Sequence, residues 1–395
     1  MKYKLNGEKM CEVKVITGTS AAAEAAKLAD VDVIAAYPIT PQTTCVEKLA
    51  EFVANGELDA EYIKVESEHS AMSACIGAAA TGARTFTATA SQGLALMHEM
   101  LFIASGMRLP IVMMVANRAL SAPINIWNDH QDSIAERDTG WIQIYAEDNQ
   151  ETLDSIIQAY KIAENENVLL PVMVCLDGFI LTHTVEPVII PKAERVRDFL
   201  GVYEPKHAYL DPDRPITQGP VGVPDCYMET RKQLEDAIER SKRVIKDVNA
   251  EFAELFNRKY GNGLVEAYNL DNADTVLVAM GTVCGTIKYV IDQLKKEGKN
   301  VGLLRIRTFR PFPKEDIKDL LKGVDNIAVL DKNVSFGFNK GALGIEMSSI
   351  LKNKKVCNYI VGLGGRDIKI EDIKKIISHV EKAEDDETVW IGLKE

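Results

Sequence analysis

Residues 62–89 read YIKVESEHSAMSACIGAAATGARTFTAT, and this stretch decides the fold class. Its first part, Tyr62 to Glu66, is rich in β-formers and predicts a strand. The small residues from Glu68 to Thr81 predict a helix, and Arg84 to Thr89 predicts a second strand. A strand, a helix and another strand in direct succession are typical of a parallel pair joined by a helical crossover.

The same alternation continues on both sides of this stretch. The apolar strands lack a polar face, which indicates a parallel sheet covered by helices on both sides, so we predict an α/β fold. Such sheets bind ligands beyond the carboxyl ends of their strands. The further predicted strands are 31–37, 109–116 and 169–176, the predicted helices are 41–55, 94–106 and 152–165, and a long loop is expected between 116 and 152.

The second half of the chain has its own organisation. Residues 187–223 are rich in proline and polar residues and predict an extended connection, and 227–260 predicts one long surface helix. A second alternating segment begins at Thr275, with strands at 275–280, 300–305, 327–330 and 356–361. We therefore predict a first domain at 1–190, a connection with a long helix at 191–264 and a smaller α/β domain at 265–395.

Composition narrows the class of protein. The 395 residues carry a net charge of −12, which argues against a nucleic-acid partner because such proteins present basic surfaces. The seven cysteines include no C-x-x-C pair, so we expect no zinc site or iron–sulfur cluster in this chain. No apolar run approaches the roughly 20 residues that span a bilayer, and no signal segment is visible. We expect a cytoplasmic protein.

Charge is distributed unevenly. The 62 residues from Ser67 to Asn128 contain five charged side chains, which are Glu68, Arg84, Glu99, Arg108 and Arg118. A stretch so poor in charge is expected to lie in the core, in a subunit interface or in both. Each charge that remains inside it needs a partner or a function.

Three polar clusters follow predicted strands of the first domain. Thr40 and Pro41 could simply begin a helix, and Glu68 could simply favour the positive end of its helix dipole. Arg118 opens a polar loop that continues to Asp132. Together, however, a hydroxyl, a carboxyl and a guanidinium meet at one edge of one sheet, which indicates a site.

Several longer motifs then carry a resemblance. Tyr-Pro-Ile-Thr-Pro at 37–41, Glu-Ser-Glu-His-Ser-Ala at 66–71, Thr-Ala-Ser-Gln-Gly-Leu at 89–94 and Asp-His-Gln-Asp at 129–132 resemble the α subunit of 2-oxoacid:ferredoxin oxidoreductases, most closely of pyruvate:ferredoxin oxidoreductase. The likeness continues in Arg-Pro-Phe-Pro at 310–313 and Gly-Leu-Gly-Gly-Arg-Asp at 362–367. It implies a pyrimidine-type thiamine diphosphate domain followed by a transketolase-C-terminal-like domain.

The resemblance also implies cofactors and partners. Thiamine diphosphate would be shared with a β subunit that holds its diphosphate and Mg²⁺, and the absence of a Gly-Asp-Gly…Asn signature here agrees with this division. Coenzyme A would be a co-substrate. Electrons would leave through γ and iron–sulfur δ subunits, or fused equivalents, to ferredoxin, in a dimer of heteromers.

The roles of single residues follow from the same resemblance. Glu68 matches the carboxyl that binds the aminopyrimidine nitrogen N1′ and so promotes loss of the thiazolium proton. Spacing alone leaves Glu66 as a competitor, and the resemblance selects Glu68. Arg118 matches the arginine that binds the carboxylate of the 2-oxo acid, and Thr40 matches a threonine that contacts substrate and coenzyme. The other candidates are Pro38 and Ile39 at the coenzyme, and Asn117, Asn128, Asp129 and His130 in a pocket wall or gate.

The implied activity is the oxidative decarboxylation of pyruvate with coenzyme A to acetyl-CoA and CO2, with electrons passing reversibly to ferredoxin. Another acid, namely 2-oxoisovalerate, 2-oxoglutarate, indolepyruvate or oxalate, remains an alternative, as does a non-catalytic scaffold subunit. Direction, stoichiometry and the docking site of coenzyme A do not follow from the sequence.

Overall fold

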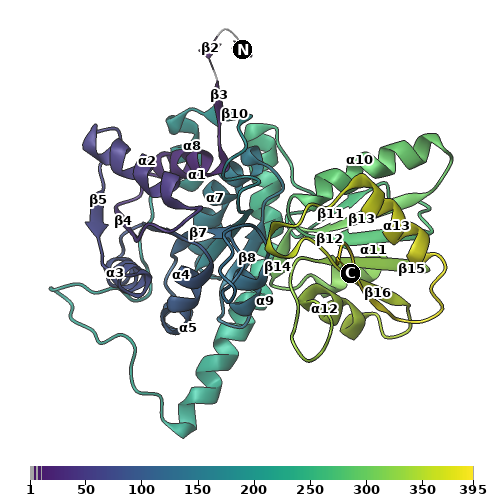
Figure 1. Cartoon of the computed structure of the whole chain (residues 1–395). Helices are drawn as coiled ribbons and strands as arrows, with labels where there is room; N and C mark the ends of the chain where they lie inside the picture. The colour runs from purple at the N-terminus through teal and green to yellow at the C-terminus, as the bar shows by residue number, and fades with distance from the viewer. Residues whose placement is uncertain (1–3, 6–7, 10, 395) are drawn as a thin grey trace.

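The computed structural model describes residues 4–5, 8–9 and 11–394, and it contains two large sheets side by side (Figure 1). Two small antiparallel ladders precede and flank them. Strand β1 (Lys4–Leu5) pairs with β2 (Glu8–Lys9), and β3 (Cys11–Ile16) pairs with β10 (Glu186–Pro191). The expected α/β class is confirmed.

The first sheet has, in the described part of the chain, seven strands in the order β14-β8-β9-β7-β6-β4-β5. All neighbours are parallel except β14, which runs antiparallel to β8 at the edge. The strands are β4 (Val33–Ala36), β5 (Glu61–Lys64), β6 (Thr85–Thr89), β7 (Val112–Asn117), β8 (Ile142–Tyr145), β9 (Val172–Asp177) and β14 (Thr308–Arg310).

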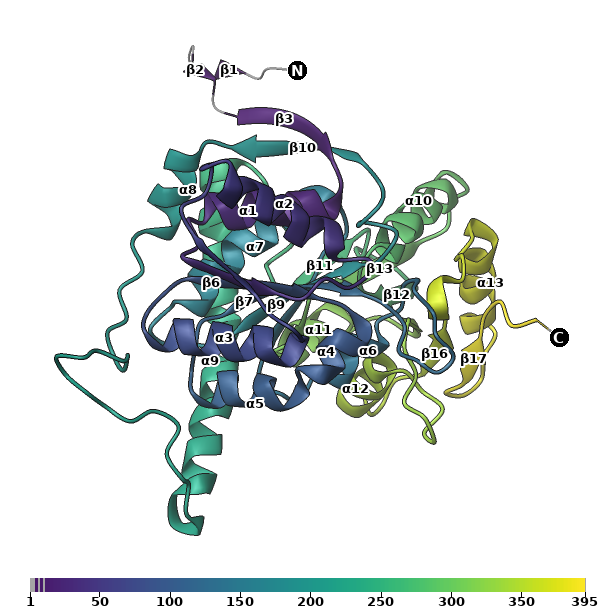
Figure 2. The same ribbon diagram turned by 60° about the vertical axis from the view of Figure 1, so that its left-hand side comes forward.

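Helices cover both faces of this sheet (Figure 2). One face carries α1 (Gly18–Leu28), α2 (Thr43–Ala54), α7 (Asn149–Ala163) and α8 (Ala193–Leu200). The other carries α3 (Glu68–Ala80), α4 (Ser91–Leu96), α5 (His98–Gly106) and α6 (Gln131–Ala135). Local capping begins several of them, because Thr17, Ser67 and Asp148 each accept a hydrogen bond from a backbone N–H in the first turn.

The second sheet has, within the same described residues, six strands in the order β11-β13-β12-β15-β16-β17, and only β11 is antiparallel to its neighbour. Its strands are β11 (Val265–Tyr268), β12 (Thr275–Ala279), β13 (Val301–Ile306), β15 (Asn326–Asp331), β16 (Val356–Ile360) and β17 (Thr388–Trp390). The helices around it are α10 (Val283–Lys296), α11 (Lys314–Leu320), α12 (Ala342–Ile350), a short 3-10 turn η1 (Leu363–Gly365) and α13 (Ile370–Val380).

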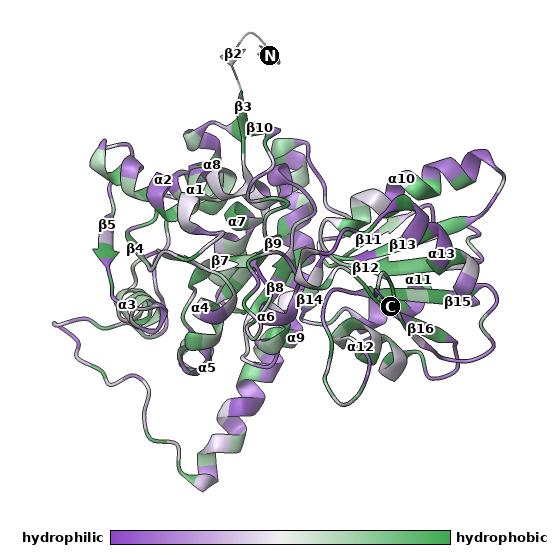
Figure 3. Ribbon diagram, in the orientation of Figure 1, coloured by the Kyte–Doolittle hydropathy of each residue, from purple (hydrophilic) through white to green (hydrophobic). Residues whose placement is uncertain are grey.

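One hydrophobic core extends across both sheets. The face of the second sheet under α12, with Val276, Val278 and Val329, belongs to the same buried cluster as β6, β7 and β9 of the first sheet. The opposite face packs on α10 and α13 as a separate cluster. Figure 3 shows the strands of both sheets as predominantly hydrophobic ribbons between helices of mixed character. The two sheets therefore form one packed unit rather than independent modules.

The long helix α9 (Pro224–Phe256) confirms the predicted surface helix, and it begins with a proline and ends at Asn257 in the left-handed conformation. Its C-terminal half buries Ile245 and Phe252 and packs against α7, whereas its first turns project from the body (Figure 1). The segment before it differs from the prediction, because β10 and α8 occupy 186–200. Only residues 201–223, which we call the arm, are extended.

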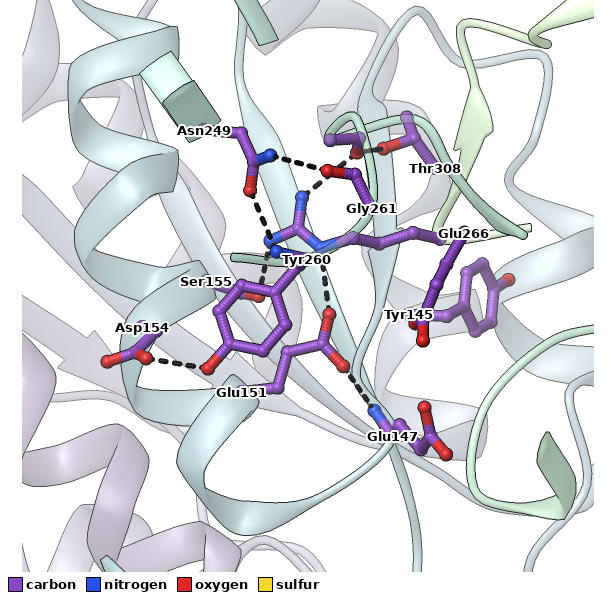
Figure 4. Close-up of polar contacts among 12 residues, drawn as sticks. Tyr145, Glu147, Glu151, Asp154, Ser155, Asn249, Tyr260, Gly261, Glu266 and Thr308 are labelled. Atoms are coloured by element: carbon purple, nitrogen blue, oxygen red, sulfur yellow. Dashed lines mark hydrogen bonds and ion pairs between the residues drawn. The ribbon is translucent and has the colours of Figure 1, made fainter. Parts of the chain in front are cut away.

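A buried ion cluster joins the two sheets (Figure 4). Glu151, in the first turn of α7, accepts hydrogen bonds from Arg305 Nη2 at 2.5 Å and from Arg307 Nε at 2.8 Å. All three side chains are at most 1% exposed. Arg305 also pairs with Glu266 of β11. The Glu151 carboxylate, on a helix that covers the first sheet, therefore anchors the segment that runs from β13 to β14.

Three other predictions needed correction. The helix expected at 94–106 is divided into α4 and α5, and the loop expected between 116 and 152 contains α6 and β8. The helix expected from Pro41, with Thr40 as its cap, starts at Thr43 instead. The reason is the side chain of Gln42, which donates to the carbonyls of Tyr37 and Ala88 and folds residues 37–42 into a turn against β6.

Candidate active site

The candidate residues follow the carboxyl ends of neighbouring strands, at one edge of the first sheet. Strands β7, β6, β4 and β5 are parallel neighbours, so their carboxyl ends lie together. The turn 37–42 follows β4, Glu68 follows β5, the start of α4 follows β6, and Arg118 follows β7. This is the edge at which open parallel sheets bind ligands.

Glu68 is the first residue of α3, where Ser67 caps the helix by accepting a hydrogen bond from the Ser70 N–H. The Glu68 side chain is 7% exposed, and within the described residues its carboxyl has no hydrogen-bond or ion-pair partner. Glu66 differs in both respects, because it is exposed and accepts a hydrogen bond from Ser70 Oγ at 2.5 Å. Of the two carboxyls, only Glu68 is buried and available to a ligand.

Gly93, in α4, gives the Glu68 carboxyl its space. A Cβ on Gly93 would stand 2.6 Å from Glu68 Oε1 and 2.5 Å from Thr89 Oγ1, closer than any real Cβ contact. Thr89 is fully buried, and its hydroxyl also lacks a partner in the described part of the molecule. Buried polar atoms are normally hydrogen-bonded, so this pair fits a site completed by a polar ligand. A nitrogen heterocycle such as an aminopyrimidine meets that requirement.

Thr40 and Arg118 are in direct contact. Arg118 Nη1 donates to the Thr40 carbonyl at 2.9 Å, and Nε donates to the carbonyl of Asn125 at 3.1 Å. The Thr40 side chain is exposed, as is Pro38, while Ile39 is half-buried against the core. The exposed residue Thr40 thus lies beside the guanidinium.

Arg118 is suited to bind an anion. Its side chain is 6% exposed, and no carboxylate in the described residues forms an ion pair with it. Burial lowers the pKa of Arg118, but a guanidinium remains charged at neutral pH. A desolvated cation whose hydrogen bonds go only to carbonyls interacts strongly with a planar carboxylate.

Asp132 connects the two parts of the site, and sequence reasoning did not assign it this position. It is buried and accepts hydrogen bonds from the backbone N–H groups of Ser91 at 2.9 Å and Arg118 at 3.0 Å, and from Asn117 Nδ2 at 2.8 Å. Burial raises the pKa of Asp132 to about 6. The carboxyl therefore ties the start of α4, which holds Gly93, to the segment that holds Arg118.

The four residues expected in a pocket wall or gate are all buried. Asn117 binds Asp132, and the Asn128 carbonyl accepts from the Gly365 N–H at 2.6 Å. Asp129 accepts from the Gly364 N–H, and His130 Nε2 lies 2.6 Å from Asp177 Oδ1. The contacts of Asn128 and Asp129 hold loop 117–132 against η1, and His130 holds it against the end of β9. A role as pocket wall or gate stays a prediction.

Behind that loop lies a cluster that the sequence did not indicate. Burial alone would raise the pKa of Asp177, but Lys332 Nζ at 2.5 Å and His130 hold it well below its usual range. Thr282 N–H also donates to Asp177. A pocket of about 270 Å³ opens beside this cluster, between the end of β9 and the start of α10, with Trp127 and Phe179 among its walls.

Two negative observations concern the residues that the structure describes. In that part of the chain, no group of three or more His, Cys, Asp or Glu side chains is placed to hold a metal ion. Nor does a helix in those same residues combine the length and apolar character that crossing a membrane requires.

Comparison with known proteins places this fold and site. Residues 24–250 match the family model described as "Pyruvate flavodoxin/ferredoxin oxidoreductase, thiamine diP-bdg", and residues 273–373 match "Pyruvate:ferredoxin oxidoreductase core domain II". The fold and these matches define an enzyme subunit of the thiamine diphosphate-binding α/β class. The chain belongs to the pyruvate:ferredoxin oxidoreductase family, which confirms the resemblance found in the sequence.

Similar sequences cover the chain almost completely. It is 92% identical to the pyruvate synthase subunit PorA of Methanocaldococcus jannaschii, over 98% of this chain and 100% of the relative. The corresponding subunit of Methanothermobacter thermautotrophicus is 57% identical over 97% of this chain and 99% of its own length. The ketoisovalerate oxidoreductase subunit VorA of Pyrococcus abyssi is 50% identical over 96% and 98%.

Solved structures agree on the fold. The 2-oxoglutarate:ferredoxin oxidoreductase of Magnetococcus marinus, with 2-oxoglutarate, coenzyme A and succinyl-CoA bound, has a TM-score of 0.70 at 19% identity. The match covers 92% of this chain and 65% of that chain. A split-gene transketolase, an inactive β4 tetramer, gives a TM-score of 0.52 at 11% identity, over 94% of this chain and 98% of that one.

Proposed function

We propose that the chain is the α subunit of a pyruvate synthase. The complex oxidatively decarboxylates pyruvate with coenzyme A to acetyl-CoA and CO2 and passes the electrons to ferredoxin, and the same site allows the reverse reaction. One observation carries the choice of acid: identity is 92% to a pyruvate synthase subunit over its whole length, against 50% to a ketoisovalerate oxidoreductase subunit.

Glu68 is proposed as the catalytic carboxyl. When bound, thiamine diphosphate supplies the carbon nucleophile that attacks the keto carbon of pyruvate and accepts the electron pair left by CO2. Glu68 holds a proton at the ring nitrogen N1′ of that coenzyme, which promotes activation of the nucleophilic carbon. Its burial, its lack of a partner in the described residues and the space above Gly93 support this role.

Arg118 and Thr40 are proposed as the substrate site. The buried guanidinium binds the pyruvate carboxylate, and the exposed Thr40 hydroxyl beside it hydrogen-bonds the oxygen of the reacting carbonyl. The contact between Arg118 and the Thr40 backbone keeps the two groups adjacent. Pro38 and Ile39, in the same turn, are proposed to contact the coenzyme.

The remaining parts of the enzyme are assigned to partners. We infer that a β subunit holds the diphosphate and Mg²⁺, and that γ and iron–sulfur δ subunits, or fused equivalents, carry electrons. The described residues offer no metal-binding cluster, and the relatives are named as subunits, which supports a complex. The division into domains at 1–190, 191–264 and 265–395 and a cytoplasmic location belong to the same proposal.

The test uses the assembled complex with the E68Q variant. We expect kcat to fall at least about 100-fold, because the amide cannot exchange a proton with N1′. The matched control is E66Q, which removes an exposed carboxyl two residues away and should stay within about two-fold of the unmodified complex. Full activity of E68Q would favour the scaffold alternative.

Substrate preference is measured with the same complex. Pyruvate should give the highest kcat/KM among pyruvate, 2-oxoisovalerate, 2-oxoglutarate, indolepyruvate and oxalate. A clear preference for another acid would overturn the assignment of pyruvate but leave the role of Glu68 intact.

A further inference from the structure

Strand β6 carries three threonines on one face. Thr85, Thr87 and Thr89 alternate along the strand, all are fully buried, and in the described structure none of their hydroxyl oxygens has a hydrogen-bond partner. Threonine is a good strand former, which accounts for its presence here. A buried hydroxyl without a partner nevertheless destabilises the fold, so a purely structural strand would favour valine at these positions.

Thr89 stands beside a second polar group that lacks a partner in the described residues. Its Oγ1 and Glu68 Oε1 both lie within 2.6 Å of a single point, the position that a Cβ on Gly93 would occupy. Thr87 lies two residues back along the strand, roughly 7 Å farther from this point. The two orphan oxygens therefore face each other across the space that Gly93 leaves free.

From this juxtaposition we propose that Thr89 is a positioning residue for Glu68. Its hydroxyl hydrogen-bonds the Glu68 carboxyl, directly after a small rotation of the glutamate side chain or through one water molecule, and fixes the direction in which the other carboxyl oxygen points. The β-branched Thr89 side chain has few rotamers in a strand, so it is a stiff support. The inference rests on the proposed function, in which that other oxygen meets N1′.

A hydroxyl suits this task for a chemical reason. It can donate to a carboxylate and can accept from a protonated carboxyl, so the contact survives while Glu68 gains and loses its proton. A backbone N–H or a lysine could serve only the charged form. Thr89 thus orients the carboxyl without favouring one protonation state strongly.

The experiment compares three variants in the assembled complex. T89V removes the hydroxyl and keeps the shape, T89S keeps the hydroxyl, and T87V is the matched control on the same strand face. We expect T89V to lower kcat about 10- to 100-fold with little change in the KM for pyruvate, as for one lost hydrogen bond to a charged group. T89S should stay within about three-fold of the unmodified complex, and T87V should be unchanged.

Two further readouts separate positioning from structural support. We expect T89V, but not T87V, to weaken the binding of thiamine diphosphate several-fold in titration calorimetry of the complex. It should also alter the near-ultraviolet circular dichroism that reports the tautomer of the bound aminopyrimidine. Melting temperatures of T89V and T87V, measured without coenzyme, should change alike, because neither hydroxyl has a partner in the described structure and the contact with Glu68 is expected to form when the coenzyme binds.

Each outcome decides the question. If T89V and T87V match in kcat, coenzyme affinity and dichroism, Thr89 has no positioning role, whatever E68Q shows. If E68Q is fully active, the proposed role of Glu68 is wrong, and the inference about Thr89, which rests on that role, is wrong with it. Should T89V not assemble, T89S and T89A are compared in the same assays, and equal values for these two overturn the inference.

Discussion

At the scale of single residues, Gly93 connects a steric requirement to the proposed chemistry. Its position in a short helix, between the Glu68 carboxyl and the Thr89 hydroxyl, leaves no room for a side chain. Helices disfavour glycine by about 1 kcal/mol relative to alanine, so its use here is a cost to local stability. The space beside Gly93 lets the Glu68 carboxyl stay buried, and no protein donor in the described residues fills that space.

We therefore expect G93A to disable the site. The new methyl group would overlap Glu68 Oε1 and Thr89 Oγ1, so the carboxyl must move and kcat of the complex should fall more than about ten-fold. The matched control is G77A in α3, where a Cβ meets nothing within 4 Å. G77A should keep its activity and raise the free energy of unfolding by up to about 1 kcal/mol. Equal activity of G93A and G77A would contradict the steric argument.

The sequence predicted only some of the residues that form this site. Glu68 and Thr40 stand in motifs that resemble a family, Arg118 matches an arginine of that family, and parallel strands bring all three to one edge. Spacing could not separate Glu68 from Glu66, because the difference lies in burial. Gln42, Thr89 and Asp132 were not assigned roles, because each acts through a contact with a residue distant in sequence, such as Ala88 or Ser91.

At the scale of elements, helix α7 joins the two sheets through one carboxylate. Glu151, labelled in Figure 4, lies in the first turn of α7. It binds Arg305, in β13, and Arg307, between β13 and β14. The guanidinium of Arg307 has no other charged partner in the described residues, because its remaining bonds go to the Gly263 carbonyl and the Ser155 hydroxyl. Arg307 is thus balanced by a single buried acid, whereas Arg305 also pairs with Glu147 and Glu266.

We expect E151Q to destabilise the chain by about 3 to 5 kcal/mol, because it leaves a buried guanidinium without a counter-charge. Chemical unfolding of the purified subunit measures this loss. An exposed pair on α9, Lys232 with Asp236, provides the control, and D236N should change the free energy of unfolding by less than about 0.5 kcal/mol. Similar values for the two variants would show that the cluster does not hold the sheets together.

Elements with a strong pattern were predictable, and those defined by tertiary contacts were not. The apolar strands β6, β7, β9, β12 and β15 and the periodic helix α9 all stand close to their predicted positions. Strand β8 was missed because its four residues lie within a segment dominated by polar side chains. Strand β14 was missed because it exists only by pairing with β8, more than 160 residues earlier.

At the scale of the whole molecule, the arm at 201–223 is the least self-contained part. Among the described residues it forms no helix or ladder beyond one bridge, from Asp211 to Arg214, and it stands away from the body (Figures 1 and 2). Its backbone contacts α3, where the Leu210 N–H donates to the Ala80 carbonyl. Val202 and Val221 are 88% and 91% exposed, and Leu210, Ile216 and Val223 of the arm are exposed as well.

We expect partner subunits to cover the arm, so its cleavage should depend on assembly. Trypsin should cut the isolated subunit first after Lys206, whose side chain is 61% exposed in an extended segment. In the assembled complex this cut should be at least about ten-fold slower. K206Q identifies the band by removing the cleavage site, and equal rates in both forms would show that the arm stays uncovered.

The position of β14 has a consequence for biosynthesis. The first sheet receives its edge strand from residues 308–310, whereas the rest of that sheet ends at Asp177. A nascent polypeptide must therefore emerge from the ribosome through Arg310 before β8 is covered, and until then it exposes an unpaired edge. A gene cut between the two sheets would leave β8 of the first fragment without its neighbour and β14 of the second fragment without its partner, so we expect neither fragment to fold as it does in the whole chain.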